Sequence, residues 1–233
     1  MNRSLVAVIA LCGVAAASTS ALAVPTLGFR LFQDGVLQAA ATTSSTTGIL
    51  QNTTTTSRFS VVTALAIGIP LIPAPALDVQ STAISSLSTF GSGSSTLRLE
   101  FTQTDVPSVS AGGLFAQLAN TMSSNLLING NLIDAVTISN FANANNVAFA
   151  TTTLLATSTF SATGASSSPI LIGNVSLPNS LFSETIVFTV TFLGAGATLN
   201  ASSQIVAVPE PATIGLFGMA LLGLGMLRRR ENV

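Results

Sequence analysis

The sequence contains no histidine, lysine, tryptophan or tyrosine, and its single cysteine is Cys12. Without imidazole, and with no thiol beyond Cys12, the chain lacks the Ser-His-Asp and Cys-His systems that activate many enzymatic nucleophiles. It also lacks the imidazole and thiolate ligands from which zinc sites are usually built. These absences exclude the commonest hydrolase and zinc chemistries. They indicate a protein that is not an enzyme and that uses no cofactor.

Charge is also scarce, since only 6% of the residues are Asp, Glu, Lys or Arg. Between residues 24 and 208, three arginines stand against six carboxylates, which gives a net charge of −3. Nucleic-acid binding needs clustered basic side chains to neutralise phosphates, so three scattered arginines exclude it. Disorder is disfavoured as well, because apolar residues make up 48% of the sequence and the net charge is small.

The first 23 residues have the three parts of a secretory signal peptide. Arg3 supplies the positive charge, residues 5–17 form the apolar segment, and Ala21 and Ala23 form the small-x-small cleavage site. We therefore expect export by the Sec route and removal of residues 1–23 by signal peptidase. A first transmembrane helix is the alternative, which the Ser and Thr residues after position 17 disfavour.

Residues 24–207 alternate between apolar and polar side chains with a period of two, as half-buried β-strands do. The segments 27–31, 59–69, 97–102 and 186–192 show this pattern clearly, and 197–205 shows it weakly. We expect the core to contain the apolar members of two of these runs: Leu97, Leu99, Phe101, Ile186, Phe188, Val190 and Phe192. The pattern predicts one soluble all-β domain, an antiparallel β-sandwich of roughly ten short strands with jelly-roll-like or Ig-like topology.

Three local signals refine this picture. Asp34-Gly35 and Asn129-Gly130 are dipeptides typical of tight hairpin turns. Residues 39–56 are rich in Thr, Ser and Ala and predict either a loose loop or a solvated pair of strands. One group has helical spacing and predicts either a short helix or a poorly alternating strand: Leu114, Phe115, Leu118 and Met122.

The C-terminal segment combines a Pro-Glu-Pro turn, an uncharged apolar run and a basic cluster. Residues 212–227 carry no charge, so as a helix they would measure about 24 Å at ~1.5 Å per residue. Flanking residues or local thinning can cover the difference from the ~30 Å hydrocarbon core. Arg228, Arg229 and Arg230 would stay on the cytoplasmic side. We therefore expect a transmembrane helix over residues 212–227, a basic tail over 228–230, and the preceding domain outside.

This tail consists of Val208, Pro209, Glu210 and Pro211, followed by the apolar run and the three arginines. It resembles the PEP-CTERM sorting signal of Gram-negative bacteria. The resemblance covers residues 208–233, about a tenth of the chain, and residues 231–233 depart from it by trailing the arginines. It implies an inner-membrane intermediate and processing of the tail by exosortase, a membrane-embedded cysteine peptidase. An ordinary C-terminal anchor is the alternative.

The carboxylates offer the remaining chemistry. Glu100 and Glu184 lie at or near strong strands, where two carboxylates could act as the acid and base of a glycosidase. We favour the simpler interpretation that both are solvated on the polar side of their strands. Asp105 and Asp134 are weak calcium candidates, because they are hard oxygen donors in turn-prone segments. They lack the dense spacing of a dedicated loop, so we predict no metal site.

The sequence thus indicates an exported, non-enzymatic structural protein of the cell surface or extracellular matrix. The setting, an exopolysaccharide or biofilm matrix, is what the family resemblance implies. The expected partners are signal peptidase, an exosortase-type peptidase, the inner membrane during transit, and exopolysaccharide. A carbohydrate-binding module of the matrix is the alternative, although the Trp and Tyr platforms that usually stack on sugars are absent.

Overall fold

The computed structural model describes residues 24–72, 76–161 and 164–208, which form β-strands and short 3-10 helices with no α-helix among them. Seven strands make up sheet A: β1 (Thr26–Gln33), β2 (Val36–Leu37), β3 (Thr43–Ser45), β7 (Ser95–Pro107), β9 (Ile133–Asn143), β10 (Thr153–Phe160) and β13 (Leu181–Phe192). Seven make up sheet B: β4 (Ile49–Thr55), β5 (Phe59–Ile67), β6 (Ala76–Ser86), β8 (Ala116–Ile128), β11 (Gly164–Ser167), β12 (Leu171–Val175) and β14 (Thr198–Ala207). The 3-10 helices are η1 (Ala39–Ala41), η2 (Ser88–Phe90), η3 (Ser108–Ala111), η4 (Gly113–Phe115) and η5 (Gly130–Leu132).

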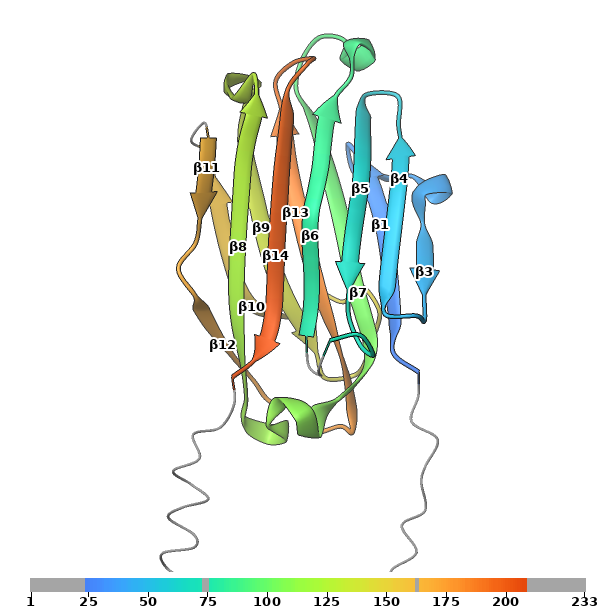
Figure 1. Cartoon of the computed structure of the whole chain (residues 1–233), viewed down its shortest axis with the longest axis vertical. Helices are drawn as coiled ribbons and strands as arrows, with labels where there is room; N and C mark the ends of the chain where they lie inside the picture. The colour runs from blue at the N-terminus through green and yellow to red at the C-terminus, as the bar shows by residue number, and fades with distance from the viewer. Residues whose placement is uncertain (1–23, 73–75, 162–163, 209–233) are drawn as a thin grey trace, which may run out of the picture.

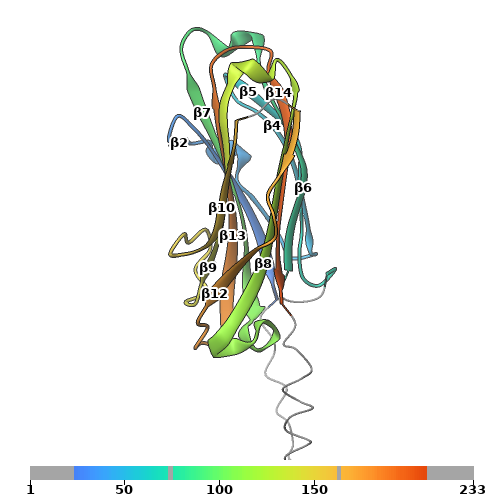
Figure 2. The same cartoon turned by 90° about the vertical axis from the view of Figure 1, so that its left-hand side faces the viewer.

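The two sheets lie face to face (Figures 1 and 2), and every strand pairing within them is antiparallel. The main strand order is β10-β9-β13-β7-β1-β2 in sheet A and β11-β8-β14-β6-β5-β4 in sheet B. The pairs β6–β14, β7–β13, β8–β12 and β9–β10 are nested in the sequence and alternate between the sheets. Such a folded-over ribbon of antiparallel pairs is a jelly roll. The antiparallel sandwich is confirmed, and the strand order selects the jelly roll from the two expected topologies.

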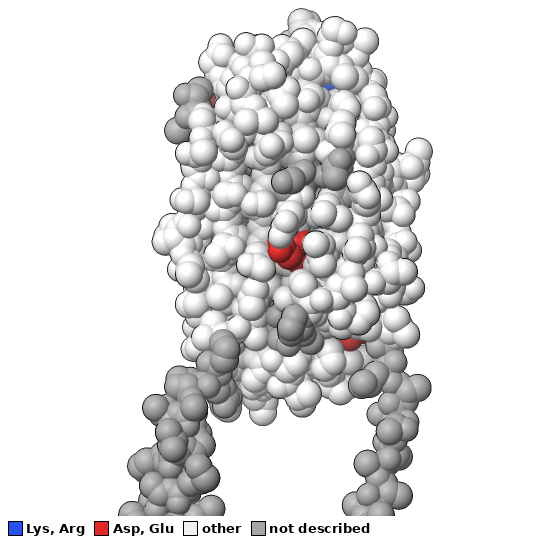
Figure 3. Space-filling view, in the orientation of Figure 1, with Lys and Arg blue, Asp and Glu red and all other residues white. Residues whose placement is uncertain are grey.

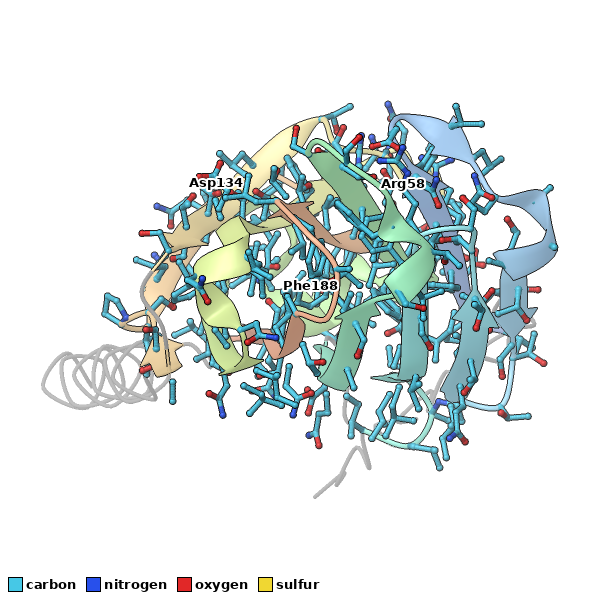
Figure 4. All side chains as sticks on the ribbon, turned by 90° about the horizontal axis from the view of Figure 1, so that it is seen from above. Arg58, Asp134 and Phe188 are labelled. Atoms are coloured by element: carbon cyan, nitrogen blue, oxygen red, sulfur yellow. The ribbon has the colours of Figure 1, made fainter. Side chains whose placement is uncertain are left out.

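The core lies between the sheets, where the inward faces of the strands meet. All seven residues expected there from β7 and β13 are buried. Seen from above, Phe188 lies between the two sheets (Figure 4), and its ring packs edge-on against Phe101 with centroids 5.9 Å apart. Phe59 of β5 and Phe192 of β13 join the two sheets at 5.1 Å. Period-two alternation therefore identified the central strands correctly.

Polar side chains from both sheets also meet in the interior and form hydrogen bonds with one another. Asn140 of β9 donates to Asn120 Oδ1 of β8 at 3.0 Å and accepts from the Ser203 hydroxyl of β14 at 2.9 Å. Gln103 makes a second link. When its side-chain amide is oriented so that both the nitrogen and the oxygen form hydrogen bonds, it donates to the Ala76 carbonyl and accepts from the Ile69 N–H. A buried amide is tolerated only when its hydrogen bonds are made. These contacts therefore fix the register of one sheet against the other.

The two turn dipeptides have different outcomes. Asp34 and Gly35 both have positive φ, 51° and 79°, and close a two-residue hairpin in which Gln33 pairs with Val36. That prediction is confirmed. Asn129 also has a left-handed φ of 47°, but it joins β8 of sheet B to β9 of sheet A. The prediction of a second hairpin is wrong, since a left-handed Asn serves a crossover between sheets equally well.

Three other segments refine the sequence interpretation. In β5 both Val61 and Ala66 are buried while Leu65 and Ile67 are only partly covered, so the alternation shifts by one residue between Val61 and Ala66. Leu118 and Met122 are buried residues of strand β8. Of the two alternatives expected for this segment, a short helix or a strand, the structure therefore shows a strand after the short 3-10 helix η4. Residues 39–56 contain β3 and β4, two solvated edge strands that belong to different sheets.

The signal peptide over residues 1–23 and the transmembrane helix over residues 212–227 lie outside the described residues. Within residues 24–72, 76–161 and 164–208, no helix is long and apolar enough to cross a bilayer. The domain boundaries expected at residues 23 and 208 therefore stay predictions.

Replacing Phe188 with Ala should destabilise the domain by about 3–5 kcal/mol, because it leaves a cavity between the sheets. Urea unfolding of residues 24–208 measures this change. Phe115 is the matched control, since this residue is 87% exposed and Phe115→Ala should change stability by less than about 0.5 kcal/mol. Equal losses for the two variants would contradict the assignment of the core.

Candidate functional site

The chain enters and leaves the domain at the same end of the sandwich. β1 begins and β14 ends at the lower end in Figure 1, where η3 and η4 connect β7 to β8. The Val208 N–H donates to the Gln117 carbonyl at 2.9 Å, which fixes the last described residue beside the start of β8. We call this region, made of Val24, Val208, η3 and η4, the exit end.

Most residues of the expected sorting signal lie beyond this point. Val208 is described, whereas Pro209, Glu210, Pro211 and the three arginines at 228–230 lie outside the described residues. The same holds for Ala21 and Ala23 of the expected signal-peptide cleavage site. What the structure adds is where these segments attach, which is the exit end in both cases.

A polar hollow lies on the outer face of sheet B, which Figure 3 shows almost without charged side chains. Two adjoining depressions of about 320 Å³ and about 480 Å³ share Ser123, Ser167 and Ser202. The hydroxyls of Ser123 and Ser202 hydrogen-bond to each other at 2.7 Å across β8 and β14. Amides and one carboxylate complete the lining: Asn125, Asn200, Gln204, Gln80 and Asp78. We call this surface the sheet B hollow.

Sequence reasoning missed the sheet B hollow. Its central residues occupy polar positions of β8 and β14, whose neighbours Met122, Leu126 and Ala201 are buried. The alternation therefore carried a signal for which side chains face outward. No local pattern indicates that β8 and β14 are neighbours, because 69 residues separate Ile128 from Thr198 and the pairing follows from the jelly-roll topology.

A charged cluster lies on the outer face of sheet A. The Glu100 carboxylate is buried there between the guanidinium groups of Arg30 and Arg98. The Arg30 guanidinium also lies 4.3 Å from the ring of Phe149, which comes from the β9–β10 loop. The Phe149 N–H donates to the Thr102 hydroxyl at 3.2 Å, so this loop is held down on the face and covers the carboxylate.

Glu184 lies on the other side of the same sheet. It is paired in register with Gln103, whose side chain reaches towards sheet B, so Glu184 faces the core. Both of its carboxylate oxygens are buried without a hydrogen-bond partner among the described residues. Burial raises the pKa of the Glu184 carboxyl from 4.5 to about 8.

The interpretation of Glu100 and Glu184 as solvated carboxylates is therefore wrong. Both side chains are buried, Glu100 because two arginines and a loop cover it and Glu184 because it occupies a core-facing position. Since they face opposite sides of sheet A, they also cannot flank a common substrate. The structure thus gives no support to the acid–base pair of a glycosidase.

The calcium candidates Asp105 and Asp134 do not come together. Asp105 lies near the exit end of β7 and exchanges two hydrogen bonds with Asn146, each 2.8 Å long. Asp134 is at the opposite end, as the second residue of strand β9, directly after η5, and is exposed. Among the residues that the structure describes, no three His, Cys, Asp or Glu side chains lie close enough to hold a metal ion.

Comparison with protein-family models identifies one match. Residues 207–230 match the PEP-CTERM protein-sorting motif. The match begins at the last residue of β14 and contains the Pro-Glu-Pro turn, the apolar run and the arginine cluster. It confirms the resemblance found in the sequence. Comparison with curated proteins finds no match to the chain.

Stability should depend on the protonation of Glu184. The pKa of the Glu184 carboxyl is about 8 in the folded protein, whereas its ordinary value is 4.5. As pH rises, the unfolded chain therefore loses this proton at a lower pH than the folded protein does. Folding stability should therefore fall by a few kcal/mol between pH 4.5 and 8 and then level off, since each unit corresponds to about 1.4 kcal/mol.

Urea unfolding of residues 24–208 at pH 5 and pH 8 measures this effect. Glu184→Gln keeps the shape of the side chain without its titration, so its stability should change much less over the same interval and should exceed that of the parent at pH 8. Equal pH dependence in the two proteins would show that Glu184 does not carry the effect.

Proposed function

We propose that the chain is an exported, non-enzymatic structural protein that an exosortase-type peptidase sorts to the cell surface or the exopolysaccharide matrix. Residues 1–23 direct it to the Sec route, where signal peptidase cleaves after Ala23. Residues 212–227 then hold it in the inner membrane, with residues 228–230 inside. Exosortase acts near residues 209–211, and the sandwich is released to its final location.

The observation that carries this proposal is the position of the sorting motif relative to the fold. The motif begins at residue 207, and β14 ends at that residue. Pro209 has no backbone N–H and restricts Val208 to extended conformations, so the pairing of β14 with β8 cannot continue through it. The signal is thus separate from the domain, and cutting after residue 208 removes no core residue.

The attachment of both segments at the exit end supports the same route. A leader and an anchor that leave from one end let the domain stand on the membrane without passing chain across its faces. The outer faces of both sheets then stay accessible in the anchored intermediate. This suits a protein whose role is contact with its surroundings and not conversion of a substrate.

Mass spectrometry of the protein from its native cells tests the sorting step. We expect the mature form to begin at Val24 and to end near residues 209–211. A mature form that still ends at Val233, in cells with a working exosortase, would show that the tail is a lasting anchor.

A variant of the Pro-Glu-Pro motif tests whether this motif or the apolar run directs the cleavage. Changing Pro209→Ala, Glu210→Gln and Pro211→Ala leaves the apolar run and the arginines intact, so the protein should still reach the membrane but should keep its C-terminus at Val233. Loss of the tail from this variant would show that other residues direct the cleavage.

A carbohydrate-binding module is the second candidate, and the sheet B hollow favours it. Hydroxyl and amide groups line the hollow, and these groups exchange hydrogen bonds readily with sugar hydroxyls. The described residues that line the hollow include no aromatic side chain, so binding would rest on many weak polar contacts. Matrix polysaccharide, which presents the same unit many times, would compensate for weak single contacts by multivalency.

Pull-down of residues 24–208 with exopolysaccharide from the native cells tests this candidate. Asn125→Ala with Asn200→Ala removes two neighbouring amides of the hollow and should abolish retention on the polysaccharide. Thr137→Ala with Thr159→Ala removes a polar pair from the outer face of sheet A and should leave retention unchanged. Retention that neither pair of changes alters would exclude the hollow as the binding surface.

A further inference from the structure

The exit end carries exposed apolar side chains on a turn that is held in place. Phe115 is 87% exposed, Val109 85% and Leu114 58%. All three belong to η3 and η4, where Gly112 and Gly113 have positive φ and make the sharp reversal between the helices. We call these three residues the apolar tip. Exposed apolar groups that gather in one place mark contact with a partner or a membrane.

The backbone around the apolar tip is fixed to the sandwich. The Ser108 N–H donates to the Ser180 carbonyl at 3.0 Å, and the Leu177 N–H donates to the Gly113 carbonyl at 3.2 Å. Both bonds tie η3 and η4 to the β12–β13 connection. The tip therefore presents its side chains from a fixed turn, and their exposure is a feature of the folded domain.

The tip lies beside the point where the chain continues towards the expected membrane span. Val208 is hydrogen-bonded to Gln117, which is two residues from Phe115. Three residues separate Val208 from the start of the apolar run at Ala212, and the four Cα-to-Cα steps between these two residues cover at most about 14 Å in an extended chain. A span that begins at residue 212 therefore holds the exit end close to the bilayer surface.

The chemistry of the exit end favours lipid over an electrostatic partner. The three arginines of the described domain lie elsewhere: Arg30 and Arg98 on the outer face of sheet A, and Arg58 against Phe90 of η2. A fourth apolar residue, Leu71, is exposed in the β5–β6 loop. This loop leads into Ala76, which pairs with Val206 near the end of β14. Apolar and aromatic side chains of this kind enter the boundary between headgroups and acyl chains.

We infer that the apolar tip docks the domain onto the outer surface of the membrane while the tail is still anchored. This inference rests on the proposed sorting route, since it requires the anchored intermediate. Docking sets the height and orientation of the domain, and it thereby holds residues 209–211 at the bilayer surface where a membrane-embedded peptidase acts. Tail cleavage then leaves only the weak contact of the tip, so the domain can depart.

The experiment uses residues 24–233, the chain that remains after removal of residues 1–23, in phosphatidylcholine vesicles that contain headgroup spin-labelled lipid. Because residues 24–233 contain no cysteine, they accept a fluorophore at a single introduced cysteine. Ser176→Cys places it beside Leu114 and Phe115, with which Ser176 lines a shallow hollow. Asn131→Cys places it at the opposite end, in η5. Flotation of the vesicles reports independently whether the tail is inserted.

We expect strong quenching at position 176, little at position 131, and no dependence on salt. Val109→Ser, Leu114→Ser and Phe115→Ser together should abolish the quenching at position 176 while flotation is unchanged. A matched set at other exposed apolar positions, Val36→Ser, Leu37→Ser and Leu193→Ser, should leave it intact. This comparison separates docking by the tip from proximity imposed by the tether alone.

Each alternative result has a defined meaning. Vesicles that float with the chain, but show quenching unchanged by the three tip substitutions, overturn docking and leave the sorting route standing. A chain that does not float overturns the anchored intermediate and the docking together. If the three tip substitutions leave quenching unchanged but slow tail cleavage in cells, the tip contacts the peptidase. That result would equally overturn contact with lipid.

Discussion

The fold depends on burying apolar side chains between two sheets, because residues 24–208 contain no cysteine that could link them covalently. The inward faces of the strands meet through aromatic rings from different parts of the chain. Phe59 and Phe90 pack at 5.7 Å, and both contact Phe192 of the opposite sheet. Offset and edge-on packing makes such contacts directional as well as apolar. The relative placement of the sheets, and with it the position of every surface discussed above, follows from these contacts.

That dependence explains what could be predicted from the sequence. Alternation marks which side of a strand is buried, so Phe101 and Phe188 were identified without any knowledge of their neighbours. A pattern with a period of two cannot show where a strand changes phase, as β5 does between Val61 and Ala66. The pattern also cannot show what covers a polar position. The burial of Glu100 was therefore missed, because Arg98, Arg30 and a distant loop enclose it. Pairing between distant strands such as β8 and β14 brings these groups together, and local pattern does not determine it.

The few charges divide the surface into regions of distinct chemistry. Glu100 pairs with two arginines on sheet A, which leaves one positive charge there, while the outer face of sheet B is lined mostly by hydroxyls and amides. The exit end adds apolar groups at the point from which the chain continues. A surface with so little charge has weak long-range attraction for any partner. On both of the proposals made for this protein, recognition therefore rests on short-range contacts: many hydroxyl bonds on sheet B, or apolar burial at the exit end.

The order of the strands also constrains when the domain can fold during export. β13 lies between β7 and β9 in sheet A, and β14 lies between β6 and β8 in sheet B. Each of the last two strands is thus central in its sheet, so sheet A cannot be completed before residue 192 has been delivered, and sheet B not before residue 207. The sorting motif follows at once. On the proposed route, the tail enters the membrane as the domain acquires its final strand, so folding is completed while the chain is anchored. Until β14 arrives, the facing edges of β6 and β8 are unpaired, and open edges of this kind invite edge-to-edge association. A C-terminal sorting signal therefore suits a fold that is closed by its own last strand.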